Sequence, residues 1–255
     1  MIRKASRNDL AFISSLHRSA NRKEQGLFMA EGEKSVAELL SSGIEIHSIA
    51  CLSDYHDQNR SAMDPFEVMV VSESELDRIS TLTTPNRVLA IGKTPQYPAY
   101  DFQKEGQTVL LLDNINDPGN MGTLIRTAEW FGVGAVFSSP GSVEFWNPKV
   151  VQASMGSIFR MKLYQQHLLD VISKAKSSQV MHVVGGVLGG DDIESFNRQS
   201  ESVLLVVGSE SHGISTEILS SLSHKLSIQR VAGSSTESLN ASVAAGIMLF
   251  HLSIK

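Results

Sequence analysis

Two short runs of almost purely aliphatic residues limit the folds open to this chain more than any other feature. Residues 109–113 read Val-Leu-Leu-Leu-Asp, and residues 203–207 read Val-Leu-Leu-Val-Val. A strand with one face in water alternates apolar and polar residues, whereas a strand covered on both faces does not need to alternate. The runs therefore predict neighbouring strands of a parallel sheet with helices on both faces.

The rest of the second half continues this α/β alternation. The final helix, from about residue 237, carries Leu239, Val243, Ile247 and Phe250 near every fourth position, which gives one apolar stripe. The stretch Gly185–Gly190 lacks Gly-x-Gly-x-x-Gly spacing and is predicted to be a loop. Further elements are predicted as helices at 121–131 and 148–155 and strands at 134–138, 180–184 and 225–229.

The first half has its own alternation of strands and helices, which indicates a separate small α/β domain. Residues 93–107 contain two prolines and no clear periodicity, so this region is the best candidate for a linker. We therefore predict domains at 1–95 and 108–255, joined by a linker at 96–107. The expected elements of the first domain are a polar helical region over 1–25, helices at 33–41 and 73–80, and strands at 46–52, 67–71 and 87–92.

The net charge of the chain argues against nucleic-acid binding, whereas the charge of its first 25 residues is compatible with it. The formal net charge is −5, and phosphate contacts need lysine and arginine. Residues 1–25 nevertheless carry a local basic excess that could meet a phosphate backbone, although composition alone favours a solvated helix face. The residues concerned are Arg3, Lys4, Arg7, Arg18, Arg22 and Lys23, set against Asp9 and Glu24.

The remaining composition indicates a cytoplasmic protein without a metal centre. The single cysteine, Cys51, cannot form an internal disulfide and lies in an apolar run, so we expect a buried strand residue. The sequence has no stretch of signal-peptide form and no apolar run as long as a membrane span. The eight histidines show no metal-ligand spacing.

Three of the predicted strands end in loops rich in glycine and polar residues, and parallel sheets bind ligands beyond the carboxyl ends of their strands. In the first loop, Asn120 and Gly122 stand at a predicted helix N-terminus, and Arg126 follows nearly two turns later. A helix N-terminus with a nearby arginine suits a phosphate or another anion. The same residues suit a turn and cap beside a surface arginine equally well.

The other two loops are also ambiguous when each is taken alone. Gly208 would let a ligand approach the backbone and Glu210 offers a carboxylate, but capping and turn formation explain this loop about as well. His212 is not paired with a nucleophile, so it is a weak candidate for a general base. In the third loop, Ser238 and Asn240 open the last helix, an arrangement that is more often structural.

Together and in this order, the three loops resemble the three motifs of the SpoU/TrmH family of ribose methyltransferases. Each motif is weak alone, but the ordered set over residues 109–253 is highly specific. The matching residues are Asn120, Gly122 and Arg126 in the first motif, Gly208, Glu210 and Gly213 in the second, and Ser238, Leu239 and Asn240 in the third.

The N-terminal part resembles the substrate-binding domain of the same family, which has an L30e-like α/β fold. The matching stretch is 22–34, and this domain is typical of members that act on ribosomal RNA rather than on the tRNA D-loop. The resemblance implies that RNA is bound through this stretch, by Arg22, Lys23, Glu31 and Lys34.

The resemblance also implies a trefoil knot of the SPOUT type in the C-terminal sheet, and a homodimer formed through that domain. S-adenosylmethionine is held by the knot loops of such proteins, largely through backbone groups, here at Gly208, Ile228 and Leu239. One departure is visible. The usual Ile-Pro dipeptide is replaced by Ile228-Gln229, and the stretch to Ser238 is about two residues longer than usual, so we expect a cofactor loop of different shape.

The function implied is methyl transfer from S-adenosylmethionine to a ribose 2′-hydroxyl of structured RNA, most of all ribosomal RNA. Arg126 would draw the proton from the hydroxyl with the help of an RNA phosphate, or would clamp that phosphate. Asn120 and Glu210 would orient Arg126 and the loops, and Ser238 and Asn240 would hold the third loop and the ribose. The alternatives are a tRNA 2′-O-methyltransferase, a non-catalytic RNA-binding factor with a decayed cofactor site, and a small-molecule enzyme.

Overall fold

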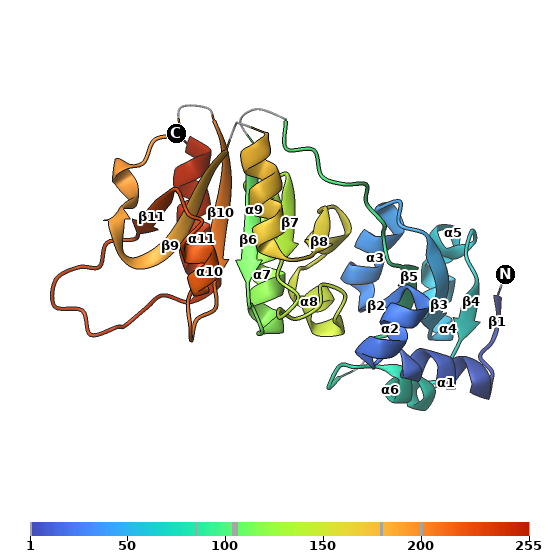
Figure 1. The fold of residues 1–255 in the computed structure, drawn as a ribbon. Coiled ribbons are helices and arrows are strands. Elements are labelled where there is room, and N and C mark those ends of the chain that lie inside the picture. Colours follow the sequence, from blue (N-terminus) through green and yellow to red (C-terminus); the bar gives the residue numbers. More distant parts are fainter. Residues whose placement is uncertain (1, 85, 104–106, 179–180, 199–200, 255) are drawn as a thin grey trace. The chain divides into compact units, whose positions relative to one another are not determined.

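The computed structural model describes residues 2–84, 86–103, 107–178, 181–198 and 201–254, and it divides into two compact units (Figure 1). The first unit comprises Met1–Gln96 and Trp146–Arg160, and the second comprises Tyr97–Phe145 and Met161–Lys255. The predicted boundaries did not anticipate that Trp146–Arg160 belongs to the first unit. Residues 104–106 of the predicted linker lie outside the described residues.

The first unit is built on a five-stranded mixed sheet of order β1-β4-β3-β5-β2. β5 runs antiparallel to β2 and β3, whereas the pairs β1–β4 and β3–β4 are parallel. The strands are β1 (Ile2–Lys4), β2 (Leu27–Glu31), β3 (Ile46–Cys51), β4 (Val68–Val70) and β5 (Val88–Lys93). The helices are α1 (Arg7–Ser15), α2 (Ser19–Gln25), α3 (Glu33–Ser41), α4 (Ser53–Gln58), α5 (Arg60–Met63), α6 (Glu73–Ile79) and α8 (Pro148–Ala153), with a 3₁₀ turn η1 (Ser157–Phe159).

Two strands of this sheet were absent from the sequence prediction. The region 1–25 was expected to be helical, but Ile2–Lys4 pairs with Val68–Val70 and forms an edge strand. Leu27–Glu31 is a strand between Gly26 and Gly32, which both have positive φ. Long-range pairing rather than local pattern decides both strands. Cys51 is fully buried in β3, which confirms the prediction for this residue.

Aromatic packing explains why Trp146–Arg160 belongs to the first unit. The ring of Phe28, in β2, lies 4.3 Å from that of Trp146 and 5.9 Å from that of Phe159 between centroids. Gly92 makes room for Phe28, because a Cβ atom at this glycine would lie 2.6 Å from the ring. Each such ring buries a large apolar area, so this packing ties the segment to β2.

The second unit contains a six-stranded sheet of order β11-β9-β10-β6-β7-β8 in which every pair is parallel. The two aliphatic runs form β6 and β10, which pair with each other, so the predicted parallel α/β sheet is confirmed. The strands are β6 (Thr108–Asp113), β7 (Ala135–Ser138), β8 (Leu163–Gln165), β9 (Met181–Asp192), β10 (Ser202–Gly208) and β11 (His224–Ser227).

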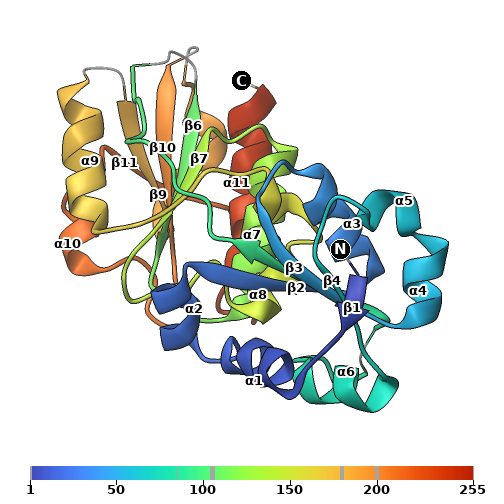
Figure 2. The same ribbon diagram turned by 90° about the vertical axis from the view of Figure 1, so that its right-hand side faces the viewer.

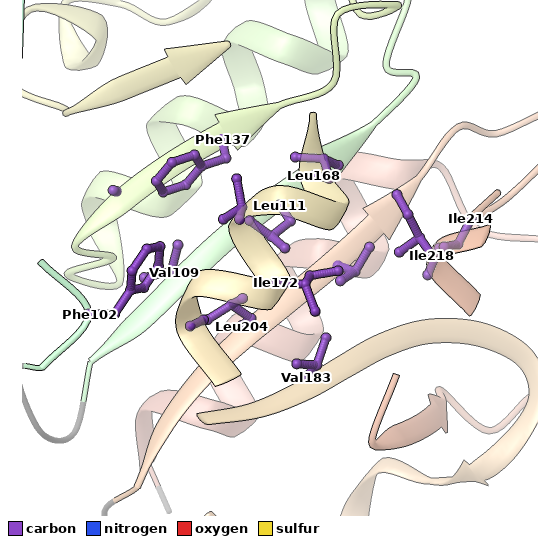
Figure 3. Packing of buried hydrophobic residues seen from close by; sticks show 14 residues of the cluster. Phe102, Val109, Leu111, Phe137, Leu168, Ile172, Val183, Leu204, Ile214 and Ile218 are labelled. Carbon is purple, nitrogen blue, oxygen red and sulfur yellow. The ribbon is translucent and has the colours of Figure 1, made fainter. Parts of the chain in front are cut away.

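Helices cover both faces of this sheet (Figure 2). α7 (Pro118–Trp130) and α11 (Ala241–Ile254) lie on one face, and α9 (Leu168–Ser177) and α10 (Thr216–Leu219) lie on the other. Figure 3 shows the core on the α9 side, where Leu111 and Leu204 meet Ile172. The neighbouring Leu110 and Leu205 are fully buried as well. Burial on both faces is the reason that these strands do not alternate.

Some boundaries in this unit differ from the prediction. The strand expected to end at residue 184 continues to Asp192, because Leu226 and Ser227 of β11 pair with Asp191 and Asp192 after a register shift. The predicted loop Gly185–Gly190 is therefore part of β9, which is followed by the 3₁₀ turn η2 (Ile193–Ser195). β8 and α9 were not predicted. In the described part of the chain, no helix combines the length and the apolar character needed to cross a membrane.

Candidate functional site

The three glycine- and polar-rich loops converge at one edge of the second sheet through a network of side-chain hydrogen bonds. Asn120 Nδ2 donates to Glu210 Oε1 at 3.0 Å, and Asn240 Nδ2 donates to Asn120 Oδ1 at 2.9 Å. Asn240 Nδ2 also donates to Glu210 Oε1. One residue from each motif thus contributes, which the common direction of parallel strands makes possible.

Helix caps hold the two asparagines in place. α7 begins at Pro118 with Asp117 as its N-cap, whose Oδ1 accepts from the backbone N–H of Asn120 at 2.7 Å. α11 begins at Ala241, and Asn240 Oδ1 accepts from the N–H groups of the next turn. Asn240 is therefore the N-cap of α11, not a residue inside its first turn as predicted. Asparagine is among the preferred residues at this position.

The structure gives Gly208 a role in the fold of its own loop, and its role at the cofactor site stays a prediction. The loop after β10 folds back in a tight turn, with paired backbone hydrogen bonds of 3.2 and 2.8 Å between Ser209 and Gly213. A Cβ atom at Gly208 would lie 2.1 Å from the carbonyl carbon of Gly213. Only glycine allows this approach, and the turn carries Glu210.

Asp113 is a residue of the site that sequence reasoning missed. It ends β6, is buried, and accepts a hydrogen bond from the backbone N–H of Ser215 at 2.8 Å through Oδ2. Its Oδ1 accepts from Asn114 Nδ2 at 3.0 Å. Asp113 therefore ties the Glu210 loop to the end of β6. The sequence signal that could have indicated Asp113 is a carboxylate at the end of an aliphatic strand.

Two further predicted site residues do not join this network. Arg126 is exposed on α7, and Ser238 is exposed in the loop before α11. Within the described residues, neither side chain forms a hydrogen bond or ion pair. His212 is exposed, and its ring is bonded to the hydroxyl of Ser211. Arg126 and Ser238 are thus available to a ligand, whereas Asn120, Glu210 and Asn240 are engaged with one another.

The loop between β11 and α11 presents backbone groups at the same edge. In the part of the chain that the structure describes, the backbone N–H and C=O of Ile228 and Leu239 make no hydrogen bond. Leu239 also keeps 44% of its surface exposed. Polar backbone groups beside an exposed apolar side chain suit a nucleoside-like ligand. These are two of the three positions predicted to bind the cofactor.

Gln229, which stands where the family usually has proline, forms a side-chain hydrogen bond that proline could not form. Gln229 Nε2 donates to Ser227 Oγ at 3.1 Å, and Ser227 Oγ donates to the carbonyl of Gly190 at 2.9 Å. Further along, Arg230 donates to the carbonyl of Thr236 at 2.8 Å. The longer loop is thus tied to the sheet at its start and closed upon itself.

Comparisons with known proteins decide the family. The SpoU rRNA methylase family model matches residues 107–250, and a model of the MRM3-like substrate binding domain matches residues 8–90. The chain belongs to the SpoU rRNA methylase family. The family resemblance inferred from the three motifs is thereby confirmed.

Among curated relatives, the 23S rRNA (guanosine(2553)-2′-O)-methyltransferase RlmP of Bacillus subtilis is 30% identical over 240 residues, covering 93% of this chain and 92% of the relative. A TrmH-family RNA methyltransferase structure from Porphyromonas gingivalis has a TM-score of 0.86 and 32% identity, covering 98% of both chains. An AdoMet-bound rRNA methyltransferase from Sinorhizobium meliloti has a TM-score of 0.86 and 27% identity, covering 98% of this chain and 97% of the other.

In the first unit, the predicted RNA-binding residues differ in their exposure to solvent. Lys23 and Lys34 are exposed. Arg22 is only 3% exposed, and its guanidinium donates to the carbonyl oxygens of Leu16 and His17 at 2.6 and 2.9 Å. Arg22 therefore holds the turn between α1 and α2, and its burial argues against the predicted contact with phosphate.

Two other charged groups of this unit are held by the protein itself. Glu31 accepts hydrogen bonds from Ser80 and Thr81, so its carboxylate fixes the segment after α6. Arg3 forms ion pairs of 2.6 Å with Asp9 and 2.8 Å with Glu67, and it holds the pKa of Asp9 well below its usual range. The basic excess of the first 25 residues is therefore partly neutralised. Across the described residues, no group of three or more His, Cys, Asp or Glu side chains is arranged to hold a metal ion.

Proposed function

We propose that this chain transfers a methyl group from S-adenosylmethionine to a ribose 2′-hydroxyl of ribosomal RNA. Membership of the SpoU rRNA methylase family, the 2′-O-methyltransferase RlmP and the AdoMet-bound relative establish the chain as an S-adenosylmethionine-dependent RNA 2′-O-methyltransferase. The observation that carries the proposal is the convergence of Asn120, Glu210 and Asn240. These are residues of all three motifs at one sheet edge.

The residues at this edge fit the cofactor. S-adenosylmethionine supplies an electrophilic methyl group on a sulfonium centre. The backbone groups of Ile228 and Leu239 would bind its polar atoms, and the exposed side chain of Leu239 would cover an apolar part. The turn that Gly208 permits would form the wall of this site.

The chain's own contribution to the reaction is mostly positioning, which can supply roughly 7–11 kcal/mol of a barrier. A ribose hydroxyl is a poor nucleophile until its proton is removed. Arg126 normally keeps its own proton, so we assign it to clamp an RNA phosphate while that phosphate or a water molecule accepts the hydroxyl proton. Ser238, exposed two residues before Asn240, would hold the ribose.

The first unit would bind the RNA substrate. Its match to the MRM3-like substrate binding domain supports an L30e-like fold and a ribosomal rather than transfer RNA substrate. Lys23 and Lys34 are exposed cations suited to phosphate contacts. An RNA-binding factor without activity is disfavoured, because the hydrogen-bonded core of the three motifs is intact.

We also assign the second unit a trefoil knot and a homodimer interface, and the protein a cytoplasmic location. The homodimer is supported by an apolar surface on α7 and α11 that consists of Trp130, Val243, Ile247 and Phe250. Trp130 is 84% exposed and Phe250 is 54% exposed. Large apolar side chains that are exposed together are typical of a protein–protein interface. The knot is supported by the family match over residues 107–250.

Replacement of the free arginine tests the assignment of the site. We expect Arg126→Ala to fold and to bind S-adenosylmethionine, and to lose methyl transfer by roughly 10²–10⁴-fold, the range for loss of a group that assists proton transfer. Calorimetric cofactor binding and label transfer to ribosomal RNA measure the two properties. Lys174→Ala, an exposed cation on α9 across the sheet, is the matched control and should keep full activity. Retained turnover in Arg126→Ala would overturn the role.

A further inference from the structure

Ser242 lies in the first turn of α11, directly behind the amide network. Its side chain is buried, and its hydroxyl donates to Asn240 Oδ1 at 2.5 Å. The same hydroxyl lies 3.4 Å from Asn120 Oδ1. A buried hydroxyl needs a hydrogen-bond partner, and here both nearby acceptors are amide oxygens of the site.

The N-terminus of α11 determines which way the Asn240 amide faces. The backbone N–H groups of Ser242 and Val243, 2.9 and 3.3 Å away, can only donate, so the atom of Asn240 that faces them must be Oδ1. The Ser242 hydroxyl adds a third donor to the same oxygen. Nδ2 must then point to the opposite side, toward Asn120 and Glu210.

The orientation passes from Asn240 to the rest of the network. Because Asn240 Nδ2 only donates, the atom of Asn120 that lies 2.9 Å away must be Oδ1. Asn120 Nδ2 is then directed to Glu210 Oε1 at 3.0 Å. Both amides and the N–H of Ala241, at 3.4 Å, converge on this one oxygen. Among the described residues, Oε2 of Glu210 forms no hydrogen bond and remains available at the site.

We infer that Ser242 is a positioning residue for methyl transfer, which holds the Asn240 amide in the orientation set by the α11 N-terminus and, through it, holds Asn120 and the Glu210 carboxylate. The predicted effect of Ser242 on kcat rests on the proposed function. The orientation itself is a property of the protein without RNA. Ser242 acts through other side chains and is not expected to touch the substrate.

Substitution of the hydroxyl separates positioning from simple packing. We expect Ser242→Ala to lower kcat roughly tenfold, since one hydrogen bond of the network is lost, while the Kd for S-adenosylmethionine and the KM for RNA change less than about twofold. Ser242→Thr keeps the hydroxyl and should recover most of the rate. Ser253→Ala removes another serine hydroxyl of α11, which among the described residues donates to the carbonyl of Phe250, and it should leave kcat unchanged.

A second measurement reads the orientation without any RNA. The side-chain NH₂ signals of Asn240 are assigned in a ¹⁵N-labelled sample by their loss in Asn240→Ala. In Ser242→Ala we expect these signals to shift and broaden, and in Ser253→Ala to stay in place. In addition, Asn120→Ala and Ser242→Ala should be clearly non-additive in kcat, as expected of residues in one network.

The outcomes distinguish this inference from the proposed function. A wild-type kcat and unchanged Asn240 signals in Ser242→Ala would overturn the positioning role. The positioning role would also be overturned if Ser242→Ala lost thermal stability in step with kcat and its effect on kcat added to that of Asn120→Ala. Such a result would indicate that Ser242 contributes packing alone. If the wild-type protein methylates no RNA, the proposed function fails, and the amide signals still decide whether Ser242 orients Asn240.

Discussion

At the scale of single residues, Gly208 and Arg22 are both constrained by the protein's own chain. Gly208 is needed because the backbone at Gly213 passes too close for any Cβ atom. Arg22 is buried against two carbonyl oxygens. Gly208 falls in the second motif and Arg22 in the stretch 22–34 that resembles the family. A family-like position by itself therefore does not distinguish a binding role from a folding role.

Gly208→Ala should therefore destabilise the second unit as well as impair cofactor binding. Its Cβ atom would require the Glu210 loop to move, and overpacking of this kind costs about 1–3 kcal/mol. The free energy of unfolding in urea measures the loss. Gly246→Ala is the matched control, because a Cβ atom there meets only Thr127 Cγ2 at 3.7 Å. Equal stability of the two variants would contradict our account of Gly208.

At the scale of elements, α11 is apolar on two sides. Ala245, Met248 and Leu249 are buried against the sheet and α7. The predicted apolar stripe is a different set, and Val243, Ile247 and Phe250 of that set are exposed. A helix that is apolar all round is normally covered on both sides, which is the physical basis for the proposed homodimer.

A charge in this exposed stripe should separate the subunits. We expect Phe250→Asp to convert a dimer into a monomer, because a carboxylate would have to be desolvated at the interface. Light scattering after size exclusion gives the molar mass. Leu169→Asp places the same charge on an exposed leucine of α9, on the opposite face of the sheet, and should remain dimeric. A monomeric wild-type protein would contradict the proposed interface.

The elements also show how far the sequence could predict the fold. β6 and β10 could be predicted from the sequence, because an aliphatic run without polar alternation is typical of a parallel strand that is buried on both faces. β8 has only three residues, and the end of β9 is held as a strand by β11 across a register shift, so neither has a local pattern. α9 was missed although Leu168, Val171, Ile172 and Ala175 follow helical spacing.

The candidate site was predictable to a lesser degree. Its three loops could be placed at one edge from the strand order of parallel sheets, and their order along the chain indicated the family. The hydrogen bonds that join Asn120, Glu210 and Asn240 span 30, 90 and 120 residues, and no local pattern encodes them. The catalytic roles of these residues stay predictions until variants are measured.

At the scale of the whole molecule, a chain with a net charge of −5 must bind RNA through local basic positions rather than overall attraction. We propose that the first unit supplies such positions and that the second holds the site for methyl transfer. The family matches to residues 8–90 and 107–250 support this division of roles.

The most direct test of the account is tritium transfer from labelled S-adenosylmethionine to ribosomal RNA from a strain that lacks this protein, with nuclease mapping of the product. The account predicts label on the 2′-oxygen of a single ribose of ribosomal RNA. Label on tRNA alone would contradict the proposed substrate. No label on either RNA, together with no cofactor binding, would contradict the account as a whole.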